Sequence, residues 1–396
     1  MFAETSSHLT SRSAMPHSMF DEFGPEYIIE TYDPKLKFRG ILVIDNLALG
    51  VGKGGIRMMP GLTVEEVWRL ARAMTFKNAL AELPFGGAKA GIIFDPKKVS
   101  LEEKRKIIES FARALKPFCP KYYIAGPDIN TGEKEMEWFA KAIGDWQAAT
   151  GKPVNLCIKL FGDKWERCGI PHEFGSTGFG VAQATKVAAD FLGLDIKKAT
   201  CAIAGFGNVG SFTFKFLQEM GTKIVAVSDI EGAILNPEGL DYNGLMKLKE
   251  KGKSIVNYLL AKKIPRESIY NLAVDILIPA ATSDVIGEKN YQKIKAKIIV
   301  EGANIPIREE YEEKLHQKGI LIVPDIVANA GGVISSFAEY QGYQPKKMFE
   351  IVKKKIVKTT RLILQESKKK KLSPRKIAKE IAKKRVRKAM AKRYQK

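Results

Sequence analysis

Short apolar runs and amphipathic segments alternate along the first half of the chain. Thr63 and Glu66 have the spacing of a helix capping box, and Pro84 marks the end of the helix that follows. Strands are predicted over residues 27–32, 40–45 and 121–124, and helices over residues 63–81, 101–115 and 133–148. This first region therefore has the rhythm of an α/β domain.

The second half has a different pattern, in which the predicted strands are continuous apolar runs. A stretch rich in glycine and proline, residues 150–175, marks a crossing between domains, and a helix is predicted at about 177–192. Strands with helices between them are predicted over residues 199–204, 224–228, 274–278, 297–301 and 320–323. Continuous apolar runs indicate strands buried on both faces of a parallel sheet.

The predicted fold class is therefore α/β with two domains. The first covers residues 26–165 and the second residues 175–340. Residues 1–25 are expected to be a disordered lead, and residues 341–396 to form C-terminal helices with a basic tail.

A glycine-rich turn follows the predicted strand 199–204. It reads Gly205-Phe206-Gly207-Asn208-Val209-Gly210, and it opens a helix that runs to about Met220. The next strand ends in Asp229, 24 residues after Gly205. This arrangement predicts a dinucleotide site, because the helix N-terminus offers free N–H groups to a pyrophosphate. The alternative is a glycine turn in an α/β domain that binds no nucleotide.

Asp229 also bears on which dinucleotide is bound. Its carboxylate would accept the adenosine ribose hydroxyls and repel a 2′-phosphate, which favours NAD. NADP stays possible, because neighbouring residues can still accommodate a phosphate. Ligands gather at loops that follow parallel strands, so Ala280 and Asn304 are expected near the cofactor.

The net charge of +21 is concentrated in the C-terminal segment. Residues 351–396 contain 20 Lys and Arg but only two acids, whereas the rest of the chain is nearly balanced. Such a tail could bind RNA, DNA or an acidic surface. Ile377, Ile381 and Val386 recur at roughly helical spacing, which favours the alternative of a helix docked by its apolar side.

The remaining composition argues for an enzyme of the cytoplasm. No run of 18 apolar residues is present, so no membrane span is expected. Cys119, Cys157, Cys168 and Cys201 form no Cys-x-x-Cys pair; they are expected to be buried thiols, and no metal site is expected. Because the chain has only four histidines, acid–base chemistry is expected to fall to lysines and carboxylates.

Three lysines stand among glycines. Lys53 lies in Gly-Lys-Gly-Gly-Ile-Arg, Lys77 near the end of the predicted helix 63–81, and Lys89 in a glycine cluster expected to form the following loop. Glycine lets a backbone approach a ligand closely. The pattern predicts an anion pocket with a lysine that changes its protonation, against the alternative of glycine turns beside solvated lysines.

Taken in order, the motifs resemble those of the glutamate/leucine/phenylalanine/valine dehydrogenases, and within them the glutamate dehydrogenases. The resemblance covers residues 26–345 and leaves the basic tail outside. It rests on Gly52-Lys-Gly-Gly-Ile-Arg57, Met74-Thr-Phe-Lys-Asn-Ala79, Pro84-Phe-Gly-Gly-Ala-Lys-Ala-Gly91, Ala125-Gly-Pro-Asp128, Gly175-Ser-Thr-Gly-Phe-Gly180, the dinucleotide turn, Glu301-Gly-Ala-Asn304 and Asn329-Ala-Gly-Gly-Val333.

The resemblance implies roles for individual residues. Lys89 would be the catalytic lysine, Asp128 would exchange protons with the amino group, and Lys77 would hold the α-carboxylate. The resemblance also implies that Lys53 and Ser336 bind the side-chain carboxylate, that Asn329 orients substrate and nicotinamide, and that Thr177 faces the nicotinamide amide. Burial and the cations Lys53 and Lys77 are expected to lower the pKa of Lys89.

The implied activity is NAD(P)-dependent interconversion of L-glutamate with 2-oxoglutarate and ammonium, by a homo-oligomer that in this family is most often a hexamer. The first domain would bind substrate and mediate assembly, and the second would bind NAD(P). The alternative function is that of a leucine-, valine- or phenylalanine-type dehydrogenase. Members with those specificities carry an apolar residue where Lys53 stands, which separates the two. A nucleotide-dependent nucleic-acid-binding protein that uses the tail, and a catalytically silent homologue, are further alternatives.

Overall fold

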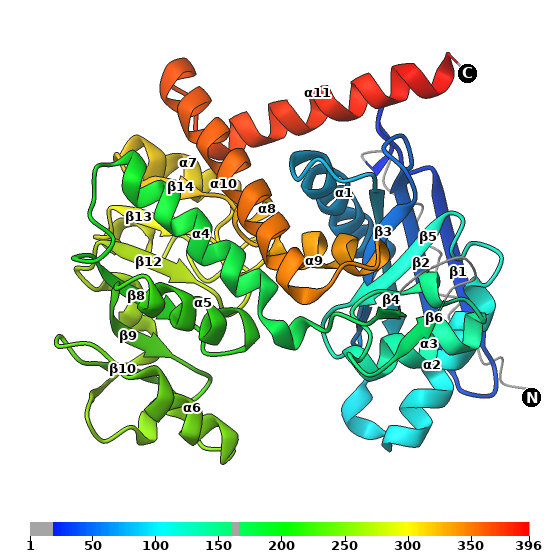
Figure 1. Cartoon of the computed structure of the whole chain (residues 1–396), viewed down its shortest axis with the longest axis horizontal. Helices are drawn as coiled ribbons and strands as arrows, with labels where there is room; N and C mark the ends of the chain where they lie inside the picture. The colour runs from blue at the N-terminus through cyan, green and yellow to red at the C-terminus, as the bar shows by residue number, and fades with distance from the viewer. Residues whose placement is uncertain (1–18, 160–165, 396) are drawn as a thin grey trace, which may run out of the picture.

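The computed structural model describes residues 19–159 and 166–395, which form two α/β domains joined by helices (Figure 1). The sheet of the first domain has the order β1-β2-β4-β3-β5, in which β4, β3 and β5 are parallel and β1 and β2 are antiparallel to their neighbours. The elements are β1 (Tyr27–Asp33), β2 (Phe38–Asn46), β3 (Gly52–Met58), α1 (Val64–Leu80), β4 (Gly86–Ile93), α2 (Leu101–Leu115), β5 (Tyr123–Pro127) and α3 (Glu133–Ile143).

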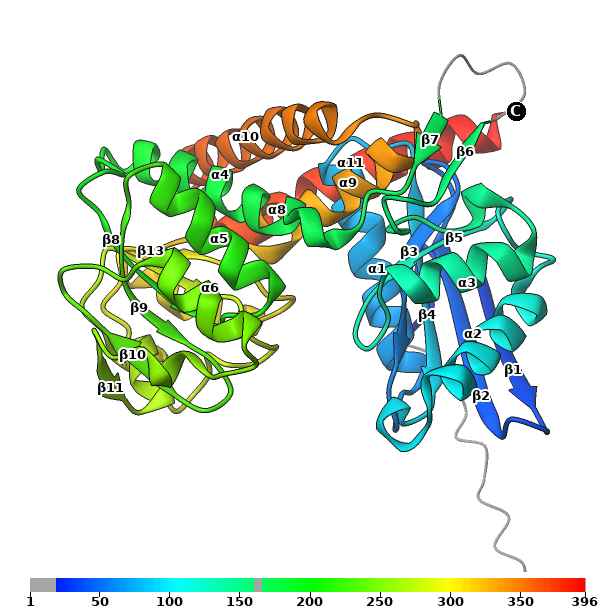
Figure 2. The same ribbon diagram turned by 60° about the horizontal axis from the view of Figure 1, so that its bottom comes forward.

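The inner strands of the first sheet are buried on both faces, whereas the edge strand β1 is partly exposed, and β2 shows how the sequence achieves this burial. Ile41 and Val43 pack against α1, whereas the alternate residues Leu42 and Ile44 pack in the core that includes α2 and α3. Side chains of a strand point to opposite faces in turn, so an apolar residue is needed at each position. Figure 2 shows α2 and α3 side by side on their face of the sheet.

The second domain contains a seven-stranded sheet in the order β11-β10-β9-β8-β12-β13-β14. Strands β9, β8, β12, β13 and β14 are parallel, and β10 and β11 form an antiparallel edge. The elements are α4 (Ser176–Phe191), β8 (Thr200–Ala204), α5 (Asn208–Glu219), β9 (Lys223–Ser228), β10 (Ala233–Leu235), α6 (Tyr242–Glu250), β11 (Lys262–Ile264), β12 (Ile276–Pro279), β13 (Ile298–Val300), α7 (Glu309–Gln317), β14 (Leu321–Val323), α8 (Asp325–Ala328) and α9 (Gly331–Tyr340).

Two central strands of the first domain were not predicted, because glycine disfavours strands. β3 and β4 are both glycine-rich, and Lys89, expected in a loop, lies inside β4. A Cβ at Gly54 would lie 1.6 Å from the carbonyl oxygen of Ala88, and one at Gly87 would lie 2.0 Å from Thr75 Oγ1. Glycine is needed at both positions, because the backbone of β4 approaches Gly54 and helix α1 approaches Gly87 so closely that a Cβ would clash.

Helix ends differ from the predicted pattern in two places. Thr63 accepts the N–H of Glu66 at 3.1 Å, but the carboxylate of Glu66 binds Arg57 instead of completing the capping box. Helix α3, predicted to residue 148, ends earlier because Gly144 adopts a left-handed conformation with φ of 84°.

The segment expected to be a disordered lead is partly folded. Met19 and Phe23 are buried, and Asp21 pairs with Arg72 of α1 at 2.6 Å. Disorder is therefore the wrong prediction for residues 19–25, while residues 1–18 lie outside the described part of the chain.

The expectation of four free thiols is also wrong. Cys157 and Cys168 lie opposite each other on β6 (Cys157–Lys159) and β7 (Glu166–Cys168), and they are joined by a disulfide. Cys119 and Cys201 are buried free cysteines, as expected. The pairing was not predicted because the sequence does not reveal that the segment between the domains folds back as a hairpin.

Two C-terminal helices connect the domains. α10 (Pro345–Lys370) packs on α4 and α9, and α11 (Pro374–Tyr394) crosses to α1, as Figure 1 shows. At its start Lys376 pairs with Glu313 of α7 at 3.0 Å, and at its end Arg393 pairs with Glu26 of the first domain at 2.8 Å. Part of the tail's positive charge thus meets acids of both domains. Within residues 19–159 and 166–395, no helix is both long and apolar enough to cross a membrane.

Candidate active site

A cavity of about 740 Å³ lies between the two domains. Eleven of the expected residues line it: Lys53, Lys77, Lys89, Asp128, Thr177, Asn208, Val209, Ala280, Asn304, Asn329 and Ser336. The expected cofactor residues Gly205, Phe206, Gly207, Gly210 and Asp229 lie outside this lining. Residues from both domains and from distant parts of the sequence therefore meet in one cleft.

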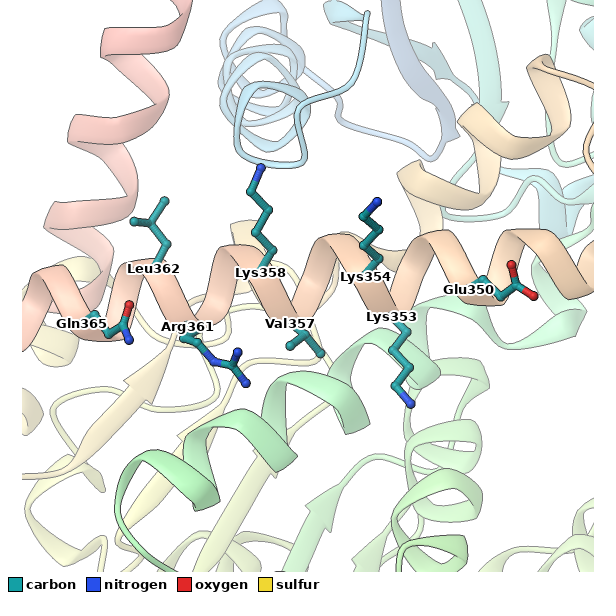
Figure 3. A pocket seen from close by; sticks show the side chains of 8 residues that line it. All are labelled: Glu350, Lys353, Lys354, Val357, Lys358, Arg361, Leu362 and Gln365. Carbon is teal, nitrogen blue, oxygen red and sulfur yellow. The ribbon is translucent and has the colours of Figure 1, made fainter.

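A second cavity, of about 680 Å³, opens over α10 and shares no lining residue with the cleft. Figure 3 shows its lining, which consists of Glu350, Lys353, Lys354, Val357, Lys358, Arg361, Leu362 and Gln365. None of the expected site residues lies there. The chemistry of the chain is therefore placed in the cleft between the domains.

The centre of the cleft is an ion triad of Lys89, Asp128 and Arg57. Lys89 Nζ and Arg57 Nε each lie 2.8 Å from Asp128 Oδ2. Burial, with a further contribution from Arg57, lowers the pKa of Lys89 against the opposing effect of Asp128. Although burial alone would raise the pKa of Asp128, the two cations hold it well below its usual range. Lys89 can therefore lose its proton more readily than an exposed lysine, and Asp128 stays ionised.

Lys77 projects from the last turn of α1 to the opposite wall. Its Nζ donates to Asn329 Oδ1 at 2.7 Å and to Asn304 Oδ1 at 3.3 Å. Asn329 in turn donates to the carbonyl oxygens of Gly302 and Ala303 and to Asn304. Burial lowers the pKa of Lys77, while Asp325 raises it. The lysine of one domain is thus held by two amide side chains of the other.

Lys53 lies in β3, at the deepest part of the cleft. It is 2 % exposed, and its Nζ donates to the carbonyl oxygen of Ala125 at 2.5 Å. Burial, with Lys152 and Lys89, lowers the pKa of Lys53 to about 7, although Glu339 raises it. Among the described residues the printed partners of Lys53 Nζ are backbone carbonyl oxygens, so its buried charge is not balanced by a carboxylate at hydrogen-bonding distance.

Ser336 and Ser335 could not be distinguished reliably from the sequence. Ser336 lines the cleft, whereas the Ser335 hydroxyl is buried and has no hydrogen-bond partner among the described residues. One helical turn beyond Ser336, Glu339 forms a buried ion pair with Lys152 at 2.6 Å and accepts the N–H of Gly151 at 2.7 Å. A buried ion pair therefore lies one helical turn from Ser336, outside the lining of the cleft.

The glycine turn between β8 and α5 has the geometry of a pyrophosphate cradle. No side chain caps the N-terminus of α5, and a Cβ at Gly207 would meet only open space. At Gly210, by contrast, a Cβ would lie 1.8 Å from the carbonyl oxygen of Gly205, so glycine is required for the tight turn. Free N–H groups beside open space fit the phosphates of a dinucleotide.

Asp229 has more local partners than the sequence suggested. Its Oδ1 accepts the N–H groups of Glu231 and Gly232 at 2.9 and 3.3 Å. Its Oδ2 accepts the Ser254 hydroxyl at 2.7 Å and the N–H of Ile255 at 2.9 Å. The carboxylate organises the loop after β9, which leaves less capacity for ribose hydroxyls than a free carboxylate would have.

Several residues of the cleft were given no role from the sequence, among them Arg57 and His172. Arg57 contacts Asp128 and is the cation that lowers the pKa of Lys89, an effect that was expected from Lys53 and Lys77. Alternation along β3 could have indicated it, since Lys53 and Arg57 lie on one face of a strand. His172 also lines the cleft.

Comparison with known proteins agrees with this geometry. The glutamate/leucine/phenylalanine/valine dehydrogenase family matches residues 168–393, and the dimerisation domain of the same family matches residues 28–144. The match to residue 393 includes the basic tail, which the motif resemblance had left outside the family pattern. The charged C-terminal helix is therefore part of the family's fold.

Individual relatives cover most of the chain. It is 43 % identical over 317 residues to the NADP-specific glutamate dehydrogenase of Saccharolobus shibatae, covering 78 % of this chain and 72 % of that one. It is 43 % identical over 311 residues to the glutamate dehydrogenase of Thermotoga maritima, covering 76 % and 72 %. The solved structure of Plasmodium falciparum glutamate dehydrogenase superposes with a TM-score of 0.84 at 25 % identity, covering 93 % of this chain and 84 % of that one. The chain therefore belongs to the glutamate/leucine/phenylalanine/valine dehydrogenase family, as its motifs indicated.

Proposed function

We propose that this amino-acid dehydrogenase catalyses the NAD(P)-dependent oxidative deamination of L-glutamate to 2-oxoglutarate and ammonium, and the reverse reaction. The observation that carries the proposal is the buried Lys53 at the floor of a cleft that also contains Lys77 and Lys89. Two buried lysines that line the same cavity, Lys53 and Lys77, suit a substrate with two carboxylates. An apolar amino acid such as leucine would leave Lys53 desolvated and unpaired, which a buried polar site rejects strongly.

Binding would use the lysines at both ends of the substrate. Lys77 would hold the α-carboxylate, and its contacts with Asn304 and Asn329 support this role because they aim its Nζ across the cleft. Lys53, with Ser336 beside it, would hold the γ-carboxylate. Since each lysine is buried, each charge-assisted contact is formed in a water-poor site, where it is stronger than at the surface.

Proton transfer would fall to Lys89 and Asp128. Asp128 would take the proton of the substrate ammonium, which leaves the amine lone pair free to assist the departure of hydride from Cα. When bound, the nicotinamide supplies the hydride acceptor. Neutral Lys89 would then remove a proton from the water that adds to the resulting iminium carbon. Asp128 would return its proton to the amino group of the resulting adduct. As the C–N bond breaks, the hydroxyl proton of the adduct would pass to the regenerated Asp128 carboxylate, which releases ammonia and leaves 2-oxoglutarate. The lowered pKa of Lys89 supports its part in the attack of water.

The cofactor is proposed to be NAD, with NADP as the alternative. The glycine turn and the uncapped α5 fit the pyrophosphate of either. The negative charge of Asp229 opposes a 2′-phosphate. Because four donors already occupy its oxygens, the preference for NAD rests on this repulsion and not on hydrogen bonds to the ribose. Two relatives are named NADP-specific, which is the reason to test both.

A homo-hexamer is the proposed assembly. The first domain matches a family dimerisation domain, and a structural neighbour from Thermus thermophilus is described as a hetero-hexameric glutamate dehydrogenase, with a TM-score of 0.82 at 27 % identity. Light scattering of the purified protein tests this number directly.

The activity is tested by following oxidation of NADH and of NADPH with ammonium and a panel of 2-oxo acids. Turnover is expected with 2-oxoglutarate, and far less with 4-methyl-2-oxopentanoate or phenylpyruvate. If the enzyme turns over one of the apolar acids but not 2-oxoglutarate, its substrate is an apolar amino acid and the proposal is wrong.

A further inference from the structure

Arg375, near the start of α11, is buried in the second domain among three carboxylates. Its Nη2 lies 2.6 Å from Glu301, 2.9 Å from Glu312 and 2.8 Å from Asp325. Its Nε also donates to Glu312. All four side chains are at most 8 % exposed. A buried cation with three buried carboxylates is stable only as a connected group, so each member depends on Arg375.

Two of these carboxylates also bind the backbone of the segments that form the cleft. Glu301 Oε2 accepts the N–H of Asp325 at 2.8 Å, which ties the end of β13 to the start of α8. Asp325 Oδ2 accepts the N–H of Ile305 at 3.0 Å. Arg375 therefore sits behind two segments, the loop of residues 301–305 and the segment 325–329 formed by α8 and its C-cap Asn329, and joins them through the carboxylates.

The same two segments present amide side chains to the substrate lysine. Asn304 belongs to the first segment and Asn329 to the second, and both accept hydrogen bonds from Lys77 Nζ, at 3.3 and 2.7 Å. A continuous set of contacts thus runs from Arg375 to Lys77.

The middle of α11 holds the helix that carries Lys77. Arg385 donates to the carbonyl oxygens of Ala79 and Leu80 at 3.0 and 2.9 Å, and it pairs with Glu82 at 2.9 Å. Lys358 of α10 reaches the same carboxylate at 2.7 Å, and Figure 3 shows its side chain pointing from α10 toward the end of α1. Ten residues of helix, about 15 Å, therefore separate the contacts of α11 with the two walls of the cleft.

We propose that Arg375 is a positioning residue for the reaction, which acts through Glu301 and Asp325 to fix Asn304 and Asn329 against Lys77. The C-terminal helix thereby sets the distance between the two walls of the cleft. The kinetic part of this inference rests on the proposed function, whereas the structural part does not.

The same arrangement affects the charge of Lys77. Asp325 and Asp128 raise the pKa of this lysine, while burial, Lys89 and Arg375 lower it. Arg375 and Lys77 keep the pKa of Asp325 low in spite of burial, so Asp325 remains an anion beside Lys77. Lys77 binds a carboxylate only when protonated, and its affinity is lost as pH rises through its pKa.

The first test compares Arg375→Lys with Lys376→Gln. Lysine keeps the charge but cannot contact three carboxylates with a planar fork. Lys376 is the matched control, since it is the next residue of α11 and pairs with Glu313 of α7 without contacting either segment. In Arg375→Lys, kcat/KM for glutamate should fall on the order of 10- to 100-fold, as expected for small misplacement of binding groups. Lys376→Gln should stay within about twofold.

Amide hydrogen exchange supplies a readout that needs no substrate. The N–H groups of Ile305 and Asp325 should exchange faster in Arg375→Lys than in the native enzyme, and at the native rate in Lys376→Gln. If the native enzyme turned over no glutamate, the proposed function would fail, while this exchange experiment would still decide the positioning role.

A second variant, Asp325→Asn, covers the case in which Arg375→Lys does not fold. It keeps the shape of the side chain and removes the anion beside Lys77, so the pKa of Lys77 should fall. The KM for glutamate should then begin to rise at a lower pH than in the native enzyme. The proposal is overturned if Arg375→Lys keeps the native kcat/KM and the native exchange rates. It is also overturned if the pH profile of KM in Asp325→Asn coincides with that of the native enzyme.

Discussion

Replacement of Lys53 by methionine should make the protein more stable while it removes glutamate activity. Burial lowers the pKa of Lys53 from 10.5 to about 7. The difference of about 3.5 corresponds to about 5 kcal/mol, at 1.36 kcal/mol for each pKa unit. Methionine has a similar length and no charge to desolvate. The native protein therefore gives up stability at this position to keep a cation in the cleft.

The pH dependence follows from the direction of the shift. Below pH 7 the lysine is charged in both the folded and unfolded chain, and the whole of the burial cost is present. Between pH 7 and pH 10.5 the folded protein holds the neutral amine, so the cost shrinks by about 1.4 kcal/mol per pH unit. The gain in Lys53→Met should thus be about 5 kcal/mol at pH 6 and about 2 kcal/mol at pH 9.

Urea unfolding at one fixed protomer concentration measures this gain, because assembly makes stability depend on concentration. Lys106→Met, at an exposed position of α2, is the control for loss of one positive charge. It should change stability by less than about 0.5 kcal/mol at either pH. The reasoning is refuted if Lys53→Met is no more stable than the native protein at pH 6, or if its gain is the same at both pH values.

Other predictions concern proton transfer and the cofactor. Lys89→Met and Asp128→Asn should each lower kcat by about 10²- to 10⁴-fold. Lys89→Met should still bind glutamate at equilibrium. A loss of kcat of about tenfold or less in steady-state assays would contradict the assigned roles. Arg57→Met should raise the pKa of Lys89, so the rise of kcat with pH should move to higher pH; an unmoved profile would remove Arg57 from this role. Asp229→Ser should improve binding of 2′,5′-ADP relative to 5′-AMP by about tenfold in calorimetry, and an unchanged ratio would show that Asp229 does not select the cofactor.

Much of the second domain could be predicted from the sequence. Its strands are continuous apolar runs, its glycine turn lies between a strand and a helix, and Asp229 directly follows the next strand. These signals are local, since a few consecutive residues determine each of them. The sequence did not reveal that loop donors already occupy Asp229, because Ser254 and Ile255 reach it from 25 and 26 residues away.

The first domain was harder to predict, because its central strands break the propensity rules. β3 and β4 contain the glycines that suggested loops, and only the approach of Ala88 and Thr75 explains why larger residues are excluded. Because Lys89 was placed in a loop, the cation that lowers its pKa was expected to be Lys53 or Lys77, whereas it is Arg57. In the same way, the charge of the tail gave no indication of which acids Arg375 and Arg385 meet.

The central claim is that Lys53 selects a substrate with two carboxylates, and it is tested most directly with glutamate and norvaline. Norvaline has the carbon chain of glutamate but ends in a methyl group. In the native enzyme kcat/KM should favour glutamate by at least about 10²-fold, because norvaline leaves Lys53 unpaired. Lys53→Met should lose most activity with glutamate and keep its activity with norvaline, so that the preference disappears. If Lys53→Met still prefers glutamate by the native ratio, Lys53 does not determine the substrate.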